Sequence, residues 1–294
     1  MFGDEGNFDS AASYLKYYGL DFANEDIKYI PVEFRSNAYF LAGHIFEPRE
    51  YKSVVFVLHG FLSHCGLCRH IIEYLIRRGY AVACYDMPGH GLSTGEPAGI
   101  EDFSEYRDAL CDFVDAVRPG LGGPYHIIGY SLGGAVALDY LLTNEDGVFD
   151  KVVVAAPLVR SWLWGLSKVG YRLYKPFGRN IPRVFRRNSS DKEYLSFVKK
   201  ADPLQTRVVP MRWMRALYEW NERISDLPPC GGKVKVIQGS DDTAVAWRFN
   251  VKFIRSKFSE VEVVIIKKGR HELFNESADI RAEVFSQIGN GLEN

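Results

Sequence analysis

The sequence predicts an α/β fold in which a mostly parallel, doubly wound sheet carries an inserted helical cap. Three observations support this prediction. Short, continuous runs rich in Val and Ile alternate with amphipathic stretches of helical length, as strands buried on both faces of a parallel sheet require. One stretch of about 75 residues shows no strand pattern, and prolines bracket it. A glycine-flanked serine lies where one buried run turns directly into a helical stretch.

The elements follow one another along the chain in an order typical of this class. A short helix over residues 11–18 precedes two strands over residues 27–35 and 39–47. From residue 53 onward come the buried-strand runs, which are residues 54–58, 81–85, 126–129, 152–155, 234–237 and 261–266. Between the second and third runs, apolar residues recur every three or four positions and form the stripe of a helix that covers the sheet. They are Phe103, Tyr106, Leu110, Phe113, Val114 and Val117.

The stretch without strands divides the chain into two parts. We expect residues 1–156 and 231–294 to form the α/β core and residues 157–230 to form the cap. The cap holds 15 Lys and Arg against six Asp and Glu, a net charge of +9. The rest of the chain therefore carries −10 within a total of −1.

Composition excludes several classes of protein. With 47% hydrophobic and 25% charged residues, the chain is typical of a globular protein rather than a disordered one. Its net charge of −1 excludes a bulk polyelectrolyte drawn to nucleic acid. No apolar run approaches the roughly 18–20 residues that span a bilayer, and residues 1–5 are acidic where a secretory signal is basic. We therefore expect a cytoplasmic protein.

The cysteines indicate neither a disulfide scaffold nor a metal centre. Their number, five, is odd, and the CxxC formed by Cys65 and Cys68 lacks a second Cys/His pair at ligand spacing. We expect free, reduced thiols and no bound metal.

The serine turn is the first candidate for chemistry. Gly129-Tyr130-Ser131-Leu132-Gly133 joins a buried run to a helix, and this turn strains the backbone of its middle residue while the glycines avoid clashes across it. Ser131 is therefore the candidate nucleophile. The simpler interpretation is that Ser131 merely caps a helix on a tight turn.

A serine nucleophile needs a histidine base and an acid that orients it, and after such a turn the acid and then the histidine follow in the chain. His271 is the only one of seven histidines C-terminal to Ser131. For the acid, Asp242 lies three residues past Gly239 at the end of a strand run, and the adjacent Asp241 is the alternative.

The reaction also needs donors for a developing oxyanion. The backbone N–H of Leu132 is one candidate, and the N–H of Phe61, in the loop after residues 54–58, is the other. Gly60 lets that loop approach a substrate closely, and His59 is placed to brace it. Alternatively, His59-Gly60 is only the exit of a strand.

These motifs together resemble the monoacylglycerol lipase and lysophospholipase branch of the α/β-hydrolases. The motifs are His59-Gly60-x-x-x-His64, Asp86-Met87-Pro88-Gly89-His90-Gly91-Leu92-Ser93, the Ser131 pentad, Gly239-x-x-Asp242, His271-Glu272 and Ala201-Asp202-Pro203-Leu204. The resemblance runs from about residue 27 to the end and is weakest in the early cap. It implies hydrolysis of a single-chain acyl ester through an acyl-enzyme, with Ser131, Asp242 and His271 as the triad, Phe61 and Leu132 as oxyanion donors, and no metal or organic cofactor.

The resemblance also frames two finer expectations. Phe61 replaces the smaller residue often found at its position, which narrows the mouth of the acyl pocket. His64 and His90 are expected to be structural.

Three functional interpretations remain open at this point. The first is hydrolysis of monoacylglycerols, lysophospholipids or similar esters, and the second is a short-chain carboxylesterase or thioesterase. The third is a catalytically silent α/β-hydrolase fold used for binding. The basic, Trp-rich cap suits contact with anionic membrane lipid; alternatively, its Lys and Arg only solvate the outside of a lid. Basic and aromatic residues also occur together in proteins that bind single-stranded nucleic acid. The full set of hydrolase motifs in this chain argues against nucleic acid as its partner.

Overall fold

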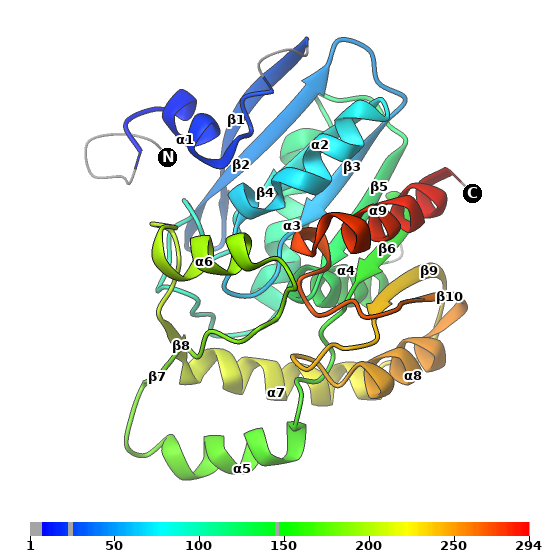
Figure 1. The fold of residues 1–294 in the computed structure, drawn as a ribbon. Coiled ribbons are helices and arrows are strands. Elements are labelled where there is room, and N and C mark those ends of the chain that lie inside the picture. The colour runs from blue at the N-terminus through cyan, green and yellow to red at the C-terminus, as the bar shows by residue number, and fades with distance from the viewer. Residues whose placement is uncertain (1–7, 23–25, 145–146, 294) are drawn as a thin grey trace.

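The protein is built on one eight-stranded sheet, seen in a computed structural model that describes residues 8–22, 26–144 and 147–293 (Figure 1). The strand order is β1-β2-β4-β3-β5-β6-β9-β10. β2 runs antiparallel to both of its neighbours, and the pairs from β4 to β10 are parallel. The strands are β1 (Ile27–Ser36), β2 (Tyr39–Pro48), β3 (Ser53–Leu58), β4 (Tyr80–Tyr85), β5 (Tyr125–Tyr130), β6 (Phe149–Ala155), β9 (Cys230–Gly239) and β10 (Phe258–Ile266). The predicted mostly parallel α/β fold is thus confirmed, whereas the acidic start, residues 1–5, lies outside the described residues.

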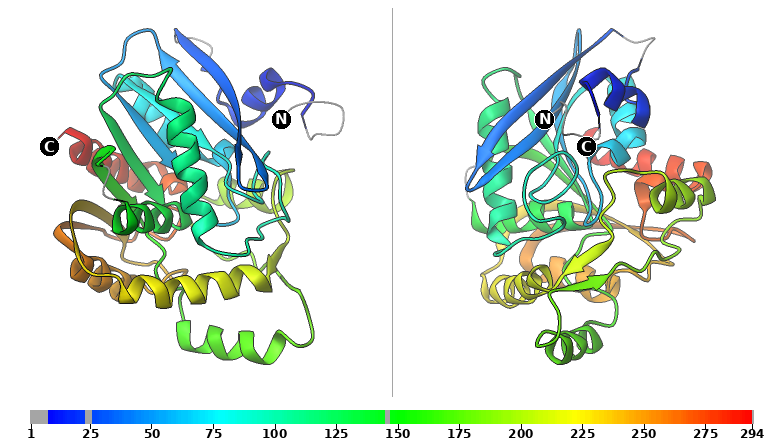
Figure 2. Two further views of the ribbon diagram at one scale, coloured as in Figure 1. Left: turned by 180° about the vertical axis from the view of Figure 1, so that it is seen from behind. Right: turned by 90° about the vertical axis from the view of Figure 1, so that its left-hand side faces the viewer.

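Helices cover both faces of this sheet (Figures 1 and 2). α3 (Ser104–Val117), α4 (Leu132–Thr143) and α8 (Trp247–Lys257) share one apolar core with one face of the sheet. α1 (Ala11–Tyr18), α2 (Arg69–Arg77) and α9 (Ala278–Glu293) share a second core on the other face. Because central strands are buried on both faces, all six residues of β3 are inaccessible to solvent, which explains their continuous apolar run.

Residues 157–229, between β6 and β9, form what we call the cap segment. It contains α5 (Trp164–Tyr174), α6 (Lys192–Lys200) and α7 (Met211–Asp226). It also contains a two-stranded antiparallel ribbon of β7 (Asn180–Pro182) and β8 (Val208–Pro210). The cap segment is thus mainly helical, and its short ribbon is an addition that the sequence pattern did not predict. Each of these strands has three residues and ends in proline, so neither presents a run long enough to be recognised as a strand.

α7 is one of the elements that hold the cap segment to the core. Trp220 is fully buried, stacks on Phe103 with ring centroids 4.3 Å apart, and donates a hydrogen bond of 2.8 Å to Asp139 on α4. By contrast, no side chain of α5 is buried, and Figure 2 shows this helix standing at the edge of the molecule beyond α7. The cap segment therefore has a fixed inner helix and an exposed outer one.

Ion pairs neutralise part of the predicted charge contrast between cap and core. Arg212 contacts Glu96 and Glu101, at 2.7 Å to the latter, and Arg215 reaches Glu101 at 2.7 Å. Arg223 lies 3.3 Å from Asp102. These cations of α7 thus face carboxylates of the core rather than solvent alone.

Candidate active site

Ser131 lies at the turn between β5 and α4 in a strained backbone conformation. Its φ of 50° and ψ of −107° fall in a region that residues with a Cβ rarely occupy. The chain closes so tightly here that a Cβ on Gly129 would lie 2.4 Å from the carbonyl oxygen of Gly133. A Cβ on Gly133 would lie 2.4 Å from the carbonyl oxygen of Leu58 on β3. Both glycines are therefore required by the turn, and Ser131 projects at the carboxyl end of the sheet.

Ser131, His271 and Asp242 form one hydrogen-bonded chain. His271 Nε2 lies 3.0 Å from Ser131 Oγ, and His271 Nδ1 lies 2.9 Å from Asp242 Oδ2. All three side chains are buried. The three residues that the sequence places in this order along 140 positions thus meet with the geometry of a nucleophile, a base and an orienting acid.

Of the two adjacent carboxylates, Asp242 faces the histidine. It is 3% exposed and accepts four hydrogen bonds, from Ala244 N, Val245 N, Gln238 Nε2 and His271 Nδ1. Asp241 is exposed and accepts from the hydroxyl of Ser240. The two aspartates therefore have different environments although they are neighbours in the chain.

Burial and the contact between His271 and Asp242 together shift the pKa values of both side chains. Burial opposes protonation of His271, but Asp242, with a smaller contribution from Glu272, raises the pKa of His271 above its ordinary value. Burial alone would raise the pKa of Asp242, yet His271 and the other donors outweigh it and lower that pKa. Asp242 is thus ionised at neutral pH and favours the His271 tautomer with hydrogen on Nδ1, which leaves Nε2 free to accept from Ser131.

The loop after β3 passes directly beside the serine. A Cβ on Gly60 would lie 2.6 Å from the ring of Tyr130 and 3.4 Å from Ser131 Cβ. His59 is buried, its Nε2 accepts from Met87 N at 2.9 Å, and its Nδ1 lies 2.8 Å from Gly60 O. Burial lowers the pKa of His59 to about 4, so a neutral imidazole braces the loop.

The two predicted oxyanion donors lie on the segments on either side of this contact: Leu132 follows Ser131 directly, and Phe61 follows Gly60. Gly133 N donates to His59 O at 3.0 Å and ties the start of α4 to the loop that carries Phe61. Within the described part of the chain, no backbone acceptor is bonded to the N–H of Phe61 or of Leu132 outside regular elements. Both amides therefore remain the candidate donors that the sequence predicts.

Ser131 and His271 open into a cavity of about 550 Å³ between the core and the cap segment. Its wall is mainly apolar and aromatic, and the apolar lining includes Phe61, Leu62, Leu158, Ile181, Val184, Phe185, Leu195, Val198, Val209, Trp213, Met214 and Leu217. The ring of Phe61 stacks on Trp213 of α7 with centroids 3.6 Å apart. A cavity of this size and polarity fits a small organic ligand with an extended apolar part.

Sequence reasoning did not name Gln238, and it named Glu272 only as a motif residue without a role. Gln238, at the end of β9, donates to Asp242 Oδ2 at 3.0 Å, and Glu272 accepts from the hydroxyl of Tyr194 on α6 at 3.1 Å. The one signal for Gln238 was its place directly before Gly239 of the Gly239-x-x-Asp242 motif.

His64 and His90, the two loop histidines expected to be structural, are not part of the hydrogen-bonded chain of Ser131, His271 and Asp242. His64 Nε2 contacts Asp202 Oδ2 at 3.0 Å, and His90 Nδ1 contacts Pro88 O at 2.9 Å. His64 thereby joins the loop after β3 to the end of α6, while His90 holds the turn after β4. Each has a structural contact that accounts for its burial.

One group of possible metal ligands occurs among the described residues, namely buried His44, Cys65 and Asp86. The two carboxylate oxygens of Asp86 accept from Cys65 N at 2.7 Å and Leu92 N at 2.8 Å. His44 Nδ1 is bonded to the hydroxyl of Tyr29. The group therefore has a role in fastening loops beneath the site.

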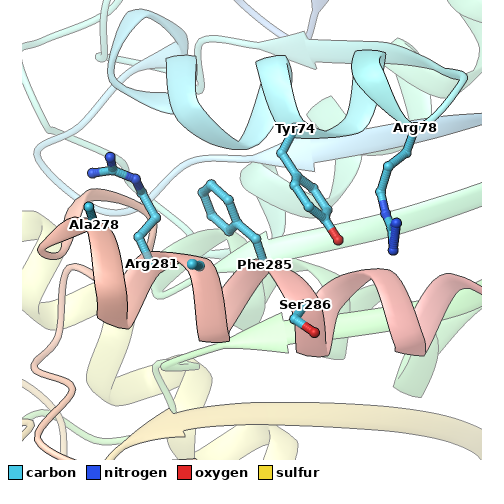
Figure 3. A pocket seen from close by; sticks show the side chains of 7 residues that line it. Tyr74, Arg78, Ala278, Arg281, Phe285 and Ser286 are labelled. Atoms are coloured by element: carbon cyan, nitrogen blue, oxygen red, sulfur yellow. The ribbon is translucent and has the colours of Figure 1, made fainter.

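A second hollow, of about 460 Å³, lies between α2 and α9 (Figure 3). Its labelled side chains are Tyr74, Arg78, Ala278, Arg281, Phe285 and Ser286. Among the described residues, no histidine or carboxylate lines this hollow, so they offer no base there to activate Ser286.

A family model and several curated proteins match this chain. The family model Hydrolase_4, described as "Serine aminopeptidase, S33", matches residues 49–278. Phospholipase YtpA of Bacillus subtilis is 26% identical over 248 residues, which cover 79% of this chain and 92% of that protein. The human monoglyceride lipase is 32% identical over 111 residues, and the match spans 37% of this chain and 36% of that protein.

Solved structures show the same fold at lower identity. A soluble variant of monoglyceride lipase from Saccharomyces cerevisiae, in complex with a substrate analog, has a TM-score of 0.75 at 18% identity and covers 88% of this chain and 93% of its own. The monoacylglycerol lipase of Paleococcus ferrophilus has a TM-score of 0.68 at 19% identity and covers 89% and 99%. At these identities the likeness concerns the fold.

Proposed function

Because the chain belongs to the Hydrolase_4 family of α/β-hydrolases, we propose that it is a serine ester hydrolase that cleaves monoacylglycerols, lysophospholipids or similar single-chain acyl esters. One observation carries the proposal: the Ser131–His271–Asp242 chain opens into a cavity with a largely apolar wall. Relatives named monoglyceride lipase and phospholipase support the same class of reaction.

The proposed mechanism proceeds through an acyl-enzyme. Ser131 Oγ attacks the ester carbonyl while His271 Nε2 takes its proton, and the N–H groups of Phe61 and Leu132 stabilise the oxyanion. His271 then protonates the leaving alcohol. A water molecule, deprotonated by His271, hydrolyses the acyl-enzyme and restores Ser131.

The charged lining of the cavity argues against peptidase activity, although the family description names an aminopeptidase. An aminopeptidase must hold a free ammonium group, for which carboxylates are the natural partners. Glu272 is the single carboxylate that lines the cavity among the described residues, against four Lys and Arg side chains. An ester substrate needs no such carboxylate cluster.

Acyl-chain and headgroup profiling of the wild type beside Ser131→Ala tests the proposal. We expect greater kcat/KM for medium and long acyl chains and no turnover by the variant. An optimum at two or four carbons would instead favour a short-chain carboxylesterase or thioesterase. Absence of a fluorophosphonate adduct on Ser131 would favour a silent binding fold.

We further propose that α5 and the turn after it let the enzyme contact anionic membrane lipid. Leu166, Leu173 and Phe177 are 67%, 68% and 85% exposed, and Arg172 and Lys175 lie among them. Apolar side chains next to cations suit the boundary between headgroups and acyl chains. No helix among the described residues is both long and apolar enough to cross a membrane.

Vesicle co-sedimentation tests this contact. We expect binding to vesicles of phosphatidylglycerol, weaker binding to neutral phosphatidylcholine, and a loss in the Leu173→Ser/Phe177→Ser double variant. Equal sedimentation of that variant would contradict a role for α5.

A further inference from the structure

Two sets of cations in the cap segment differ in a way that the sequence does not show. Those of α7 meet carboxylates: Arg212, Arg215 and Arg223 contact acids of the core. Four others line the cavity that contains Ser131, namely Arg183, Arg186, Arg187 and Lys199. Among the described residues, none of these four has a carboxylate within 4.0 Å. Four cations without a carboxylate partner among the described residues thus line the candidate active site, while others of the cap segment, such as Arg172 and Lys175, are exposed outside it.

Arg183 is the most strongly fixed of the four. Its Nη1 donates to Gln205 Oε1, to Thr206 O at 3.2 Å and to Leu62 O at 3.4 Å, and its guanidinium lies 4.5 Å from the ring centre of Phe185. Its Nε and Nη2 have no acceptor within the described part of the chain. The guanidinium is therefore held at one edge and stacked on one face, while its other donors remain available.

The environment of Arg183 is unfavourable for a charge without a partner. The side chain is half-buried, and burial lowers the pKa of Arg183, with Glu272 and Asp202 opposing this only in part. Asp202 is already bonded to Tyr18, His64 and Gln205. A partly desolvated arginine, which stays protonated, is best compensated by an anion with two oxygens in one plane.

We propose that Arg183 is the anchor of a phosphate subsite within the cavity, and that the preferred substrates are single-chain esters whose headgroup carries a phosphate. This inference rests on the proposed esterase function and refines its substrate class. Arg186, Arg187 and Lys199 add positive charge around the anchor, and the apolar wall takes the acyl chain. Because Leu62 adjoins Phe61, the same arginine links headgroup recognition to the loop beside Ser131.

The test measures binding of two non-hydrolysable probes below their critical micelle concentrations, a decylglycerol ether and its phosphate monoester. We expect the wild type to bind the phosphate probe at least about tenfold more tightly. In Arg183→Gln, affinity for the phosphate probe should fall about 10- to 100-fold, with less than about a twofold change for the neutral probe. Arg183→Lys, which keeps the charge but loses the planar fork, should be intermediate.

Arg255→Gln is the matched control, because it removes the same charge from an exposed position of α8 outside the cavity. It should leave both affinities unchanged. Equal wild-type affinities, an equal loss of affinity for both probes in Arg183→Gln, or a similar loss in Arg255→Gln would overturn the proposal. Equal loss would mean that Arg183 only supports the loop at Leu62.

Turnover separates this proposal from the broader one. If the wild type prefers the phosphate probe but hydrolyses no acyl ester, the phosphate subsite stands and the esterase function fails. If it hydrolyses monoacylglycerols and binds both probes equally, the reverse holds. Inorganic phosphate should compete weakly with the phosphate probe, because it lacks the apolar chain. Competition by inorganic phosphate as strong as that by the probe itself would contradict a lipid headgroup site.

Discussion

Replacement of Asp242 by Asn tests the orienting role of this carboxylate, because Asn matches its shape but lacks two acceptor sites. Oδ1 of Asp242 accepts from Ala244 N at 2.8 Å and Val245 N at 3.1 Å, and Oδ2 accepts from His271 and Gln238. An Asn amide that turned its NH₂ toward the two backbone N–H groups would leave both donors buried and unsatisfied. Each costs about 1–3 kcal/mol, so this orientation is disfavoured.

The favoured orientation of the new amide in Asp242→Asn disables the base. Its NH₂ then donates to His271 Nδ1, which must carry no hydrogen, so Nε2 carries the hydrogen and cannot accept from Ser131. Gln238 can follow by rotating its amide, because its Oε1 has no partner among the described residues. From the wrong tautomer we expect kcat to fall about 10⁴-fold, which corresponds to roughly 5 kcal/mol of activation free energy.

Steady-state hydrolysis of a chromogenic decanoate ester measures this effect. Asp241→Asn is the control, because Asp241 is exposed and its carboxylate bonds only to Ser240 among the described residues; it should retain at least half of the activity. A thermal melt checks that both variants fold. Retention of more than about a tenth of kcat in Asp242→Asn, or a comparable loss in Asp241→Asn, would refute the reasoning.

Three further predictions concern pH, the cap and the turn. Only neutral His271 accepts the proton, and its pKa is raised above the ordinary value of 6.5. The value of kcat/KM should therefore increase with pH through a limb centred above 6.5. A pH profile whose limb lies below that value would contradict this prediction. Trp220→Phe removes the donor to buried Asp139 and should lower the free energy of unfolding in urea by about 1–3 kcal/mol, whereas an unchanged midpoint argues against the anchor. Gly129→Ala places a Cβ 2.4 Å from the backbone across the turn and should abolish activity or folding. Gly122→Ala is the control, because a Cβ there meets open space, and it should leave activity unchanged. If both variants were active, the turn could relax around the added Cβ.

Much of the fold was predictable because its elements have local signatures. β3 is continuously apolar since it is buried on both faces, and the stripe of Phe103 to Val117 marks α3 because a helix repeats about every 3.6 residues. β7 and β8 have no such signature. Each is stabilised mainly by pairing with the other, which lies far along the chain, so neither is visible in a local window.

The sequence by itself determined the sheet, the turn at Ser131 and the order in which Asp242 and His271 follow, because these depend on neighbouring residues and on chain direction. The tertiary structure decided which of two adjacent aspartates faces His271, since that depends on the donors around the end of β9. It also decided the meaning of the basic cap. Charge counted along the chain adds all cations equally, but folding pairs those of α7 with core carboxylates and leaves Arg183 in the cavity without one among the described residues. Pairing is a property of distance in space, which composition does not contain.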